Sequence, residues 1–293
     1  MAPDAQLEWE SRAAKPAAAA AFGSALLTLF STFIVRLLIS ERPDNAREVM
    51  GVIDQNPGAF YIAAGIQAIG TFLTVGALFY LYRVVKFRRP ELPSYALPLL
   101  VAGGVLLVVS SFLSAVDQID SAREYFASGP RNESRAEDLL RERSGVTLGL
   151  GSGASLASAI ALIYLGLYAM RAGVVSRFMG ILGIVIGAIY VLGSLLPIGG
   201  PGILQTFWLG ALGVLFLGRW PGGRGPAWET GEADEWPSAA RLREDKSPMA
   251  GALSTSDPRD PQPAAEAEAE AEAGAEEDDS QPVSRKRKKR KPR

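Results

Sequence analysis

The sequence contains no cysteine and no histidine. Without cysteine the chain has no disulfide bonds, no thiolate catalysis and no thiolate metal site. Without histidine it lacks the most common metal ligand and the usual proton shuttle at neutral pH. Membrane metalloproteases, haem proteins and histidine-based proton relays are therefore excluded, and we expect neither a cofactor nor a bound metal ion.

Charged residues are scarce over most of the chain. Hydrophobic residues make up 48% of the whole, and the long apolar runs lie between residues 17 and 220, whereas residues 221–293 are polar. The formal net charge of −1 conceals separate acidic and basic blocks, so it predicts little by itself. This division predicts a membrane domain followed by a polar tail.

Six apolar segments are candidates for membrane-spanning helices. They cover residues 17–39, 59–82, 93–116, 146–170, 178–196 and 203–218. A helix needs about 20 apolar residues to cross a hydrocarbon core of about 30 Å. The first run is too long for a cleavable signal peptide, and further spans follow it. We therefore predict an all-α, polytopic bundle of six transmembrane helices over residues 17–220, preceded by a short cytoplasmic segment at 1–16.

The uncharged segment at 146–170 carries small residues at every fourth position. They are Gly149, Gly153, Ala157 and Ala161, and Gly183 and Gly187 repeat the spacing in the next span. Lipid tails give no hydrophobic drive for helix association, so small residues that allow close approach mark packing faces. We predict that both faces pack against neighbouring helices.

Basic residues cluster in alternate loops. With six spans, the basic loops at 83–89, 171–177 and 219–224 fall on one side of the membrane, together with Arg12 and Lys15. Because basic loops stay in the cytoplasm, both termini are predicted to be cytoplasmic. The excess of Arg over Lys and the abundance of Ala and Gly are typical of a bacterium with GC-rich DNA. We therefore expect a bacterial cell membrane protein.

The two long loops on the opposite side contain helical patterns. In the loop at 40–58, apolar residues share one side of a short helix that Asp44 could cap and that could lie along the membrane surface. In the loop at 117–144, the third span continues past the membrane until Ser-Gly-Pro at 128–130 breaks it. A capping-box pattern from Ser134 to Glu137 then predicts a second helix.

The spans contain no Asp, Glu, Lys or His at mid-depth, which argues against ion- or proton-coupled transport. Their polar residues are neutral, and two alternatives stay open for them: hydrogen bonds between helices, or a small polar cavity opening outward around Gln67 and Gln205. Asp117, Asp120 and Glu124 lie about one turn apart outside the third span. They could bind a cation, although a solvated helix face is the commoner arrangement.

The chain from 221 to 293 is predicted to be a disordered cytoplasmic tail, with an acidic block at 266–279 and a basic block at 285–293. Three tryptophans recur every eight residues at its start: Trp220, Trp228 and Trp236. This segment could lie along the headgroup layer of the membrane, or it could be disordered with isolated aromatic residues. The candidate contact residues of the basic block are Arg285, Lys286, Arg287, Lys288, Lys289, Arg290 and Lys291. Because the tail is tethered to the membrane, binding of this block to anionic lipid, at about 1 kcal/mol per basic residue, is favoured over binding to nucleic acid. It is also favoured over a solvated tail that binds nothing specific.

Two motifs carry a resemblance to a family. They are RAGVVSRFMGILGIVIGAIYVLG at 171–193, a basic loop that leads into a Gly-rich helix, and RWPGGRGPAWETGEA at 219–233. These resemble uncharacterised actinobacterial integral membrane proteins of about six helices, and the resemblance covers roughly residues 146–236. It implies a membrane location and a helical architecture, and it implies no activity.

These observations predict a non-enzymatic integral membrane protein. Its partners are expected to be the lipid bilayer, anionic lipid and a cytoplasmic protein that the tail anchors at the inner face. The alternative function is a channel or carrier for a small neutral or weakly polar solute. An enzyme would have to work with Asp, Glu, Ser, Tyr or Arg near the interface, so we expect no catalytic residues.

Overall fold

The computed structural model describes residues 3–38, 43–142, 144–195, 202–221, 223–234 and 236, and over these residues it contains helices and no strand. The helices are α1 (Pro3–Leu38), α2 (Ala46–Gln55), α3 (Pro57–Arg88), α4 (Ala96–Ala127), α5 (Glu133–Arg141), α6 (Gly145–Arg171), α7 (Arg177–Leu195), α8 (Gly202–Phe216) and α9 (Ala227–Thr230).

Among the described residues, five helices are long and apolar enough to cross a membrane: α1, α3, α4, α6 and α7. The chain is therefore an all-α polytopic membrane protein. The sixth predicted span corresponds to α8, which is apolar but has 15 residues, or about 22 Å of helix. α1 begins at Pro3 and includes most of the predicted segment at 1–16 in one helix of 36 residues.

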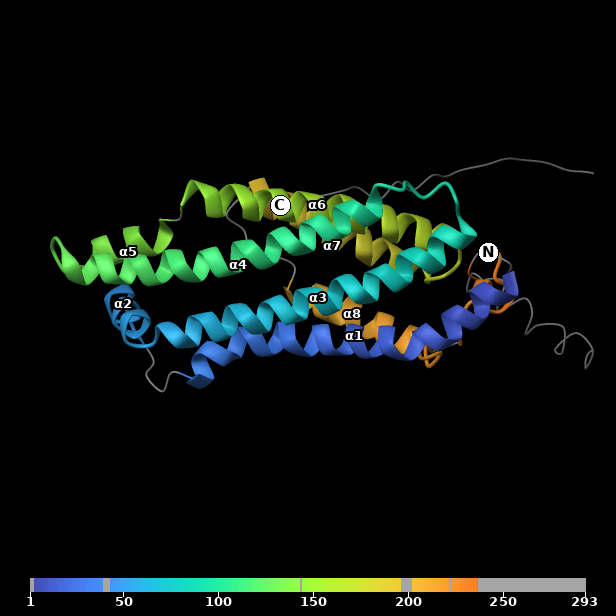
Figure 1. Ribbon diagram of the computed structural model, residues 1–293, viewed down its shortest axis with the longest axis horizontal. Helices are drawn as coiled ribbons and strands as arrows, with labels where there is room; N and C mark the ends of the chain where they lie inside the picture. Colours follow the sequence, from blue (N-terminus) through green and yellow to red (C-terminus); the bar gives the residue numbers. More distant parts are fainter. Residues whose placement is uncertain are drawn as a thin grey trace, which may run out of the picture. The chain divides into compact units, whose positions relative to one another are not determined.

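The six apolar helices run alongside one another (Figure 1), and their contacts form a ring around a common centre. α1 packs against α3 and α8, α3 packs against α4, α4 against α6, and α6 against α7, while a smaller contact between α7 and α8 closes the ring. Leu78, Ile186 and Trp208 are fully buried inside it. Apolar side chains such as Phe72 and Ile181 are exposed on the outside, where lipid is their natural solvent.

Glycines set the closest helix contacts. A Cβ at Gly187 would lie 2.9 Å from the Ala159 carbonyl oxygen of α6, and one at Gly183 would lie 3.1 Å from the Trp208 ring of α8. Gly183 and Gly187 therefore lie close against α8 and α6, respectively. Gly166 and Gly180 make a similar contact between α6 and α7, where a Cβ at Gly166 would lie 2.9 Å from the Gly180 carbonyl oxygen.

The predicted packing face of α6 is wrong for its first two residues. Gly149 and Gly153 are exposed, with nothing within 4 Å of an added Cβ, whereas Ala157 is half-buried and Ala161 is buried. A strict four-residue spacing turns by about 40° at each step around a helix of 3.6 residues per turn. Gly149 and Ala161 therefore cannot share one face, and buried residues such as Ala154 form the actual one.

The three predicted basic loops meet at one end of the bundle, which we call the basic end. Arg89 from the loop after α3 donates to the Arg171 carbonyl at the end of α6, 3.2 Å away. Trp228, beyond α8, donates its indole N–H to the Val174 carbonyl at 2.9 Å. The loops after α3, α6 and α8 therefore lie at the same end of the bundle.

At the opposite end, which we call the acidic end, α2 and α5 pack on the continuation of α4 (Figure 1). α4 runs to Ala127 and stops at Ser128 before Gly129, which has a φ of 74°, so the predicted continuation and break are confirmed. α2 buries Met50 and Ile53 in a cluster with Ile119 and other residues of α4 and α5. The apolar side of α2 therefore contacts protein.

Both predicted caps at the acidic end are wrong in register. Asn45, and not Asp44, caps α2 by accepting the Glu48 N–H at 2.9 Å. Asn132 caps α5 by accepting the Arg135 N–H at 3.0 Å, so the helix starts before Ser134. Neighbouring Asx and Ser residues have similar capping ability, and the local backbone conformation selects among them.

The predicted disordered tail is wrong at its beginning. Residues 223–234 and 236 are described, and within them Ala227 and Trp228 are buried. Trp228 belongs to the core of the bundle, and Trp220 and Trp236 pack against that core. Residues 237–293, which include the acidic block and the basic residues at 285–291, lie outside the described part of the chain.

Candidate functional site

A cavity of about 100 Å³ lies at the centre of the ring of six apolar helices. Each of these helices lines it. The polar lining residues are Thr28 of α1, Gln67, Thr71 and Thr74 of α3, Ser158 of α6, Tyr190 of α7 and Gln205 of α8, and α4 contributes Leu100, Gly104 and Leu107. We call this space the central cavity.

The central cavity lies about halfway along the bundle. Ser158 is the middle residue of α6, and Thr71 and Thr74 lie near the middle of α3. Polar groups at this depth of a membrane are expensive unless they pair with one another or face water. A polar cavity near the midplane is also where membrane transporters typically bind their substrates.

The structure places the two predicted cavity residues, Gln67 and Gln205, on this same cavity. The Tyr190 hydroxyl donates a hydrogen bond to Gln205 Oε1 at 2.5 Å and joins α7 to α8. The amide nitrogen of Gln205 has no hydrogen-bond partner among the described residues. Sequence reasoning did not single out Tyr190, because a tyrosine in an apolar helix carries no signal of what it faces.

Two threonine hydroxyls on the cavity wall use their protons within α3. Thr71 donates to the Gln67 carbonyl oxygen at 2.9 Å, and Thr74 donates to the Gly70 carbonyl oxygen at 3.0 Å. The Thr74 oxygen is also hydrogen bonded to the Ser24 hydroxyl of α1. The threonine oxygens therefore face the cavity as acceptors.

A second, more open pocket of about 270 Å³ lies between α3 and α4, toward the acidic end. Its lining residues are Phe60, Ala63, Ala64, Gln67, Ser111, Ala115 and Gln118. Gln67 lines this α3–α4 pocket and the central cavity alike. The side chain of Gln67 therefore stands between the open pocket and the buried cavity.

The bundle is closed on the other side of the central cavity. Leu78, Leu100 and Leu162 line the cavity, and buried residues such as Leu81 and Phe216 fill the bundle toward the basic end. Arg88 follows Leu78 by ten positions in α3, which is about 15 Å of helix. In the described state the cavity is therefore closed toward the basic end, and the open pocket next to it lies toward the acidic end.

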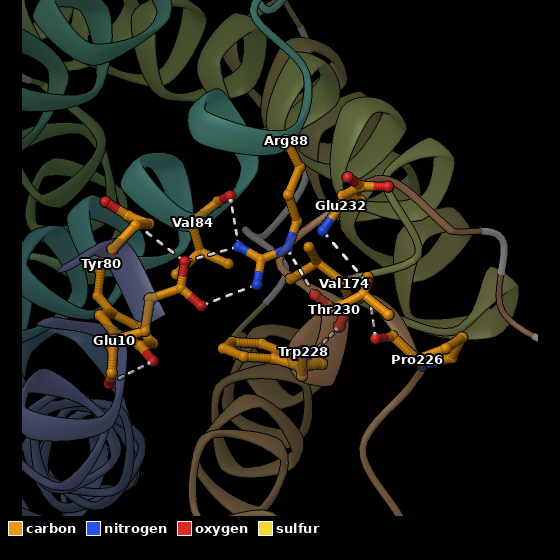
Figure 2. A network of polar contacts seen from close by, with 11 residues as sticks. Glu10, Tyr80, Val84, Arg88, Val174, Pro226, Trp228, Thr230 and Glu232 are labelled. Atoms are coloured by element: carbon orange, nitrogen blue, oxygen red, sulfur yellow. Dashed lines mark hydrogen bonds and ion pairs between the residues drawn. The ribbon is translucent and has the colours of Figure 1, made fainter. Parts of the chain in front are cut away.

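At the basic end, Glu10 of α1 and Arg88 of α3 form a buried ion pair (Figure 2). Arg88 donates from both terminal nitrogens to the two carboxylate oxygens of Glu10, at 2.6 and 2.8 Å, and the two side chains are 4% and 0% exposed. Gln6 donates to the same carboxylate at 2.9 Å. A bidentate pair of this kind fixes both distance and orientation.

The same ion pair holds the segment that follows α8. Arg88 Nε donates to the Ala227 carbonyl oxygen at 2.9 Å, and the neighbouring Trp228 lies beside the Tyr80 ring, with 6.3 Å between ring centroids. Tyr80 donates its hydroxyl to the Glu10 carbonyl oxygen at 3.1 Å (Figure 2). The N-terminal part of α1, the end of α3 and the segment around α9 are thus joined by one network of polar contacts.

The carboxylates outside the third span do not converge on a cation site. Asp117 accepts hydrogen bonds from the backbone N–H and the hydroxyl of Ser144. Asp120 pairs with Arg123 at 3.5 Å, and Glu124 pairs with Arg135 at 3.8 Å. Within the described ranges, no group of three acidic residues could hold a metal ion.

Comparison with known proteins identifies one family. The model of a domain of unknown function, DUF4386, matches residues 18–220. The match contains all lining residues of the central cavity, but Glu10 and Trp228 lie outside it. It also ends before most of the motif at 219–233. No curated protein and no solved structure matches the chain.

Proposed function

The chain belongs to the DUF4386 family, whose function is unknown, and we propose that this member is a membrane carrier for small, uncharged polar solutes. The observation that carries the proposal is the central cavity, which polar side chains from α1, α3, α6, α7 and α8 line at mid-depth. A bundle whose helices only packed together would leave no space between these groups.

The lining of the central cavity supports an uncharged solute. Its polar groups are hydroxyls and amides, and none of its lining residues is ionisable at neutral pH. A charged solute would lose its hydration without gaining an opposite charge in the cavity. This desolvation costs far more free energy than the desolvation of a neutral molecule. A neutral molecule can replace its hydrogen bonds to water with bonds to Gln205 and Thr71.

We also propose that the basic end faces the cytoplasm of a bacterial cell membrane, with both termini inside. The arginines of the loops at 83–89, 171–177 and 219–224 support this orientation, because basic loops remain in the cytoplasm. The described state then corresponds to a carrier whose cavity is approached from outside, through the α3–α4 pocket, and is closed inside by the apolar core.

The proposal is tested with purified protein in liposomes. After an osmotic shock, light scattering follows vesicle swelling as glycerol, urea or acetamide enters. We expect protein-dependent swelling with these solutes and none with sucrose, which exceeds a cavity of about 100 Å³. Gln205→Leu is expected to slow swelling, whereas Gln55→Leu, an exposed position in α2, leaves it unchanged. Swelling rates equal to those of protein-free vesicles for every solute would refute the carrier.

A second function is supported by the sequence of the tail. We propose that the basic residues at 285–291 bind anionic lipid at the cytoplasmic face, at about 1 kcal/mol each near the surface, and hold a cytoplasmic protein there. Affinity purification with and without residues 246–293 tests this anchor. Partners that stay the same after the deletion would count against it, and they would leave the carrier proposal unaffected.

A further inference from the structure

The orientation of the Gln205 side chain determines what the central cavity offers a solute. A glutamine amide has one oxygen that accepts hydrogen bonds and one nitrogen that donates two. The Gln205 oxygen already accepts from the Tyr190 hydroxyl at 2.5 Å. Because this bond fixes the amide, its nitrogen remains to donate to a molecule in the cavity.

Thr71 offers the complementary group. Its hydroxyl proton is used in the bond to the Gln67 carbonyl oxygen at 2.9 Å, so its oxygen retains lone pairs that can accept. Thr71 is 9% exposed and lines the cavity, as does Thr74, whose proton is used in the same way. The wall therefore presents an amide donor and hydroxyl acceptors in fixed roles.

The volume of the central cavity limits the size of the solute. Its volume of about 100 Å³ corresponds to roughly three water molecules at about 30 Å³ each. A molecule of about four to six non-hydrogen atoms fits this space. Urea and acetamide have this size, and each carries a carbonyl acceptor directly beside an amino donor.

We propose that the central cavity recognises small neutral amides, the chemistry of urea and acetamide, and that Tyr190 contributes by fixing the amide of Gln205 as the donor to the solute carbonyl. The inference rests on the proposed carrier function. A solute such as acetone has the same shape and the same carbonyl acceptor but no donor for the threonine oxygens. Binding it leaves a buried acceptor without a partner, which is the basis for discrimination between analogues of equal size.

The test is competition for uptake of radiolabelled urea into proteoliposomes. For the wild-type protein we expect acetamide to inhibit uptake about tenfold more strongly than acetone, the ratio that corresponds to roughly one hydrogen bond to a neutral group. Tyr190→Phe keeps the ring but removes the hydroxyl that fixes Gln205. In this variant inhibition by acetamide and by acetone is expected to weaken by a similar factor while uptake continues, because the carbonyl oxygens of both solutes lose the fixed amide donor of Gln205. Tyr164→Phe, at a tyrosine of α6 that is not part of the cavity lining, is the matched control and should keep the wild-type inhibition by both solutes.

The outcomes separate this inference from the function on which it rests. Uptake of glycerol without uptake of urea or acetamide would overturn the amide preference and leave a carrier. Equal inhibition by acetone and acetamide would do the same, and unchanged inhibition by acetamide in Tyr190→Phe would overturn the role of Tyr190. Absence of uptake for every small solute would remove both proposals. Elution of Tyr190→Phe as wild type in size-exclusion chromatography establishes that the variant is folded.

Discussion

The buried ion pair between Glu10 and Arg88 is the contact whose loss we expect to destabilise the protein most. Arg88→Met removes the guanidinium and leaves the Glu10 carboxylate, which is 4% exposed, with Gln6 as its remaining side-chain donor. Breaking a buried pair by removing one partner costs about 3–5 kcal/mol. The Ala227 carbonyl oxygen also loses the donor that holds the segment after α8.

Thermal unfolding in detergent, followed by the fluorescence of the five tryptophans, measures this loss. For a domain of this size 1 kcal/mol shifts the melting temperature by about 2–4 °C, so Arg88→Met is expected to melt about 10 °C below wild type. The double variant Glu10→Met and Arg88→Met should recover most of the difference, because replacing both charges with apolar groups is close to neutral.

The exposed pair between Glu8 and Arg12 is the matched control. It lies in the same helix as Glu10, at a distance of 3.6 Å, with both side chains about 70% exposed. Surface pairs contribute little, so Arg12→Met should melt as wild type does. Equal melting temperatures for Arg88→Met and Arg12→Met would refute the buried network at the basic end.

Four further variants test packing and capping. Trp228→Ala is expected to release the segment after α8 and make it susceptible to limited proteolysis, since the indole that bonds Val174 is lost; unchanged cleavage would contradict its place in the core. Gly166→Ala should lower the melting temperature, because the new Cβ would lie only 2.9 Å from the Gly180 carbonyl oxygen. Gly149→Ala, in open space, should raise the melting temperature slightly, because alanine favours the helix. The reverse order of melting temperatures would contradict the packing. Asn132→Ala removes the α5 cap and should destabilise that helix by about 1 kcal/mol, measured as faster amide hydrogen exchange over α5.

Hydrophobic run length and loop charge were enough to predict the helical membrane fold. The apolar runs correspond to α1, α3, α4, α6, α7 and α8, and the basic loops do meet at one end. These features follow from local composition, because the bilayer requires long apolar helices. Helix faces were harder to predict. Residues spaced strictly by four from Gly149 turn gradually around α6, so only the last of them, Ala161, is buried against other helices.

The network at the basic end could not be predicted from local patterns. Glu10 and Arg88 are 78 residues apart in the sequence, and each is charged in a segment that is expected to be solvated. Trp228 lies among Gly and Pro, which predict no regular structure by themselves. Its burial depends on long-range contacts with Val174 and Tyr80, which become visible only when α3 and the loop after α6 are placed in space.

The cavity was predictable in part. Gln67 and Gln205 stood out because long amides are rare in apolar spans, and an amide at that depth requires a partner or a polar space. Which of these two alternatives applies depends on how α3 and α8 face each other across the ring. The role of Tyr190 depends further on its hydrogen bond to Gln205, which fixes the chemistry of the cavity wall.

The central claim is that a polar cavity reached from the acidic end binds small uncharged solutes. Because the chain has no cysteine, Thr71→Cys introduces a single thiol on the cavity wall. The most direct measurement is the rate at which a small methanethiosulfonate, added outside intact cells, modifies this thiol with and without acetamide, urea or glycerol. We expect the reagent to modify the thiol at residue 71 from outside, and at least one of these solutes to slow this modification. At the outward-facing neighbour, Phe72→Cys, we expect slow modification and no protection by any of the solutes. A thiol at residue 71 that stays unmodified from outside, or that no solute protects, would contradict the account.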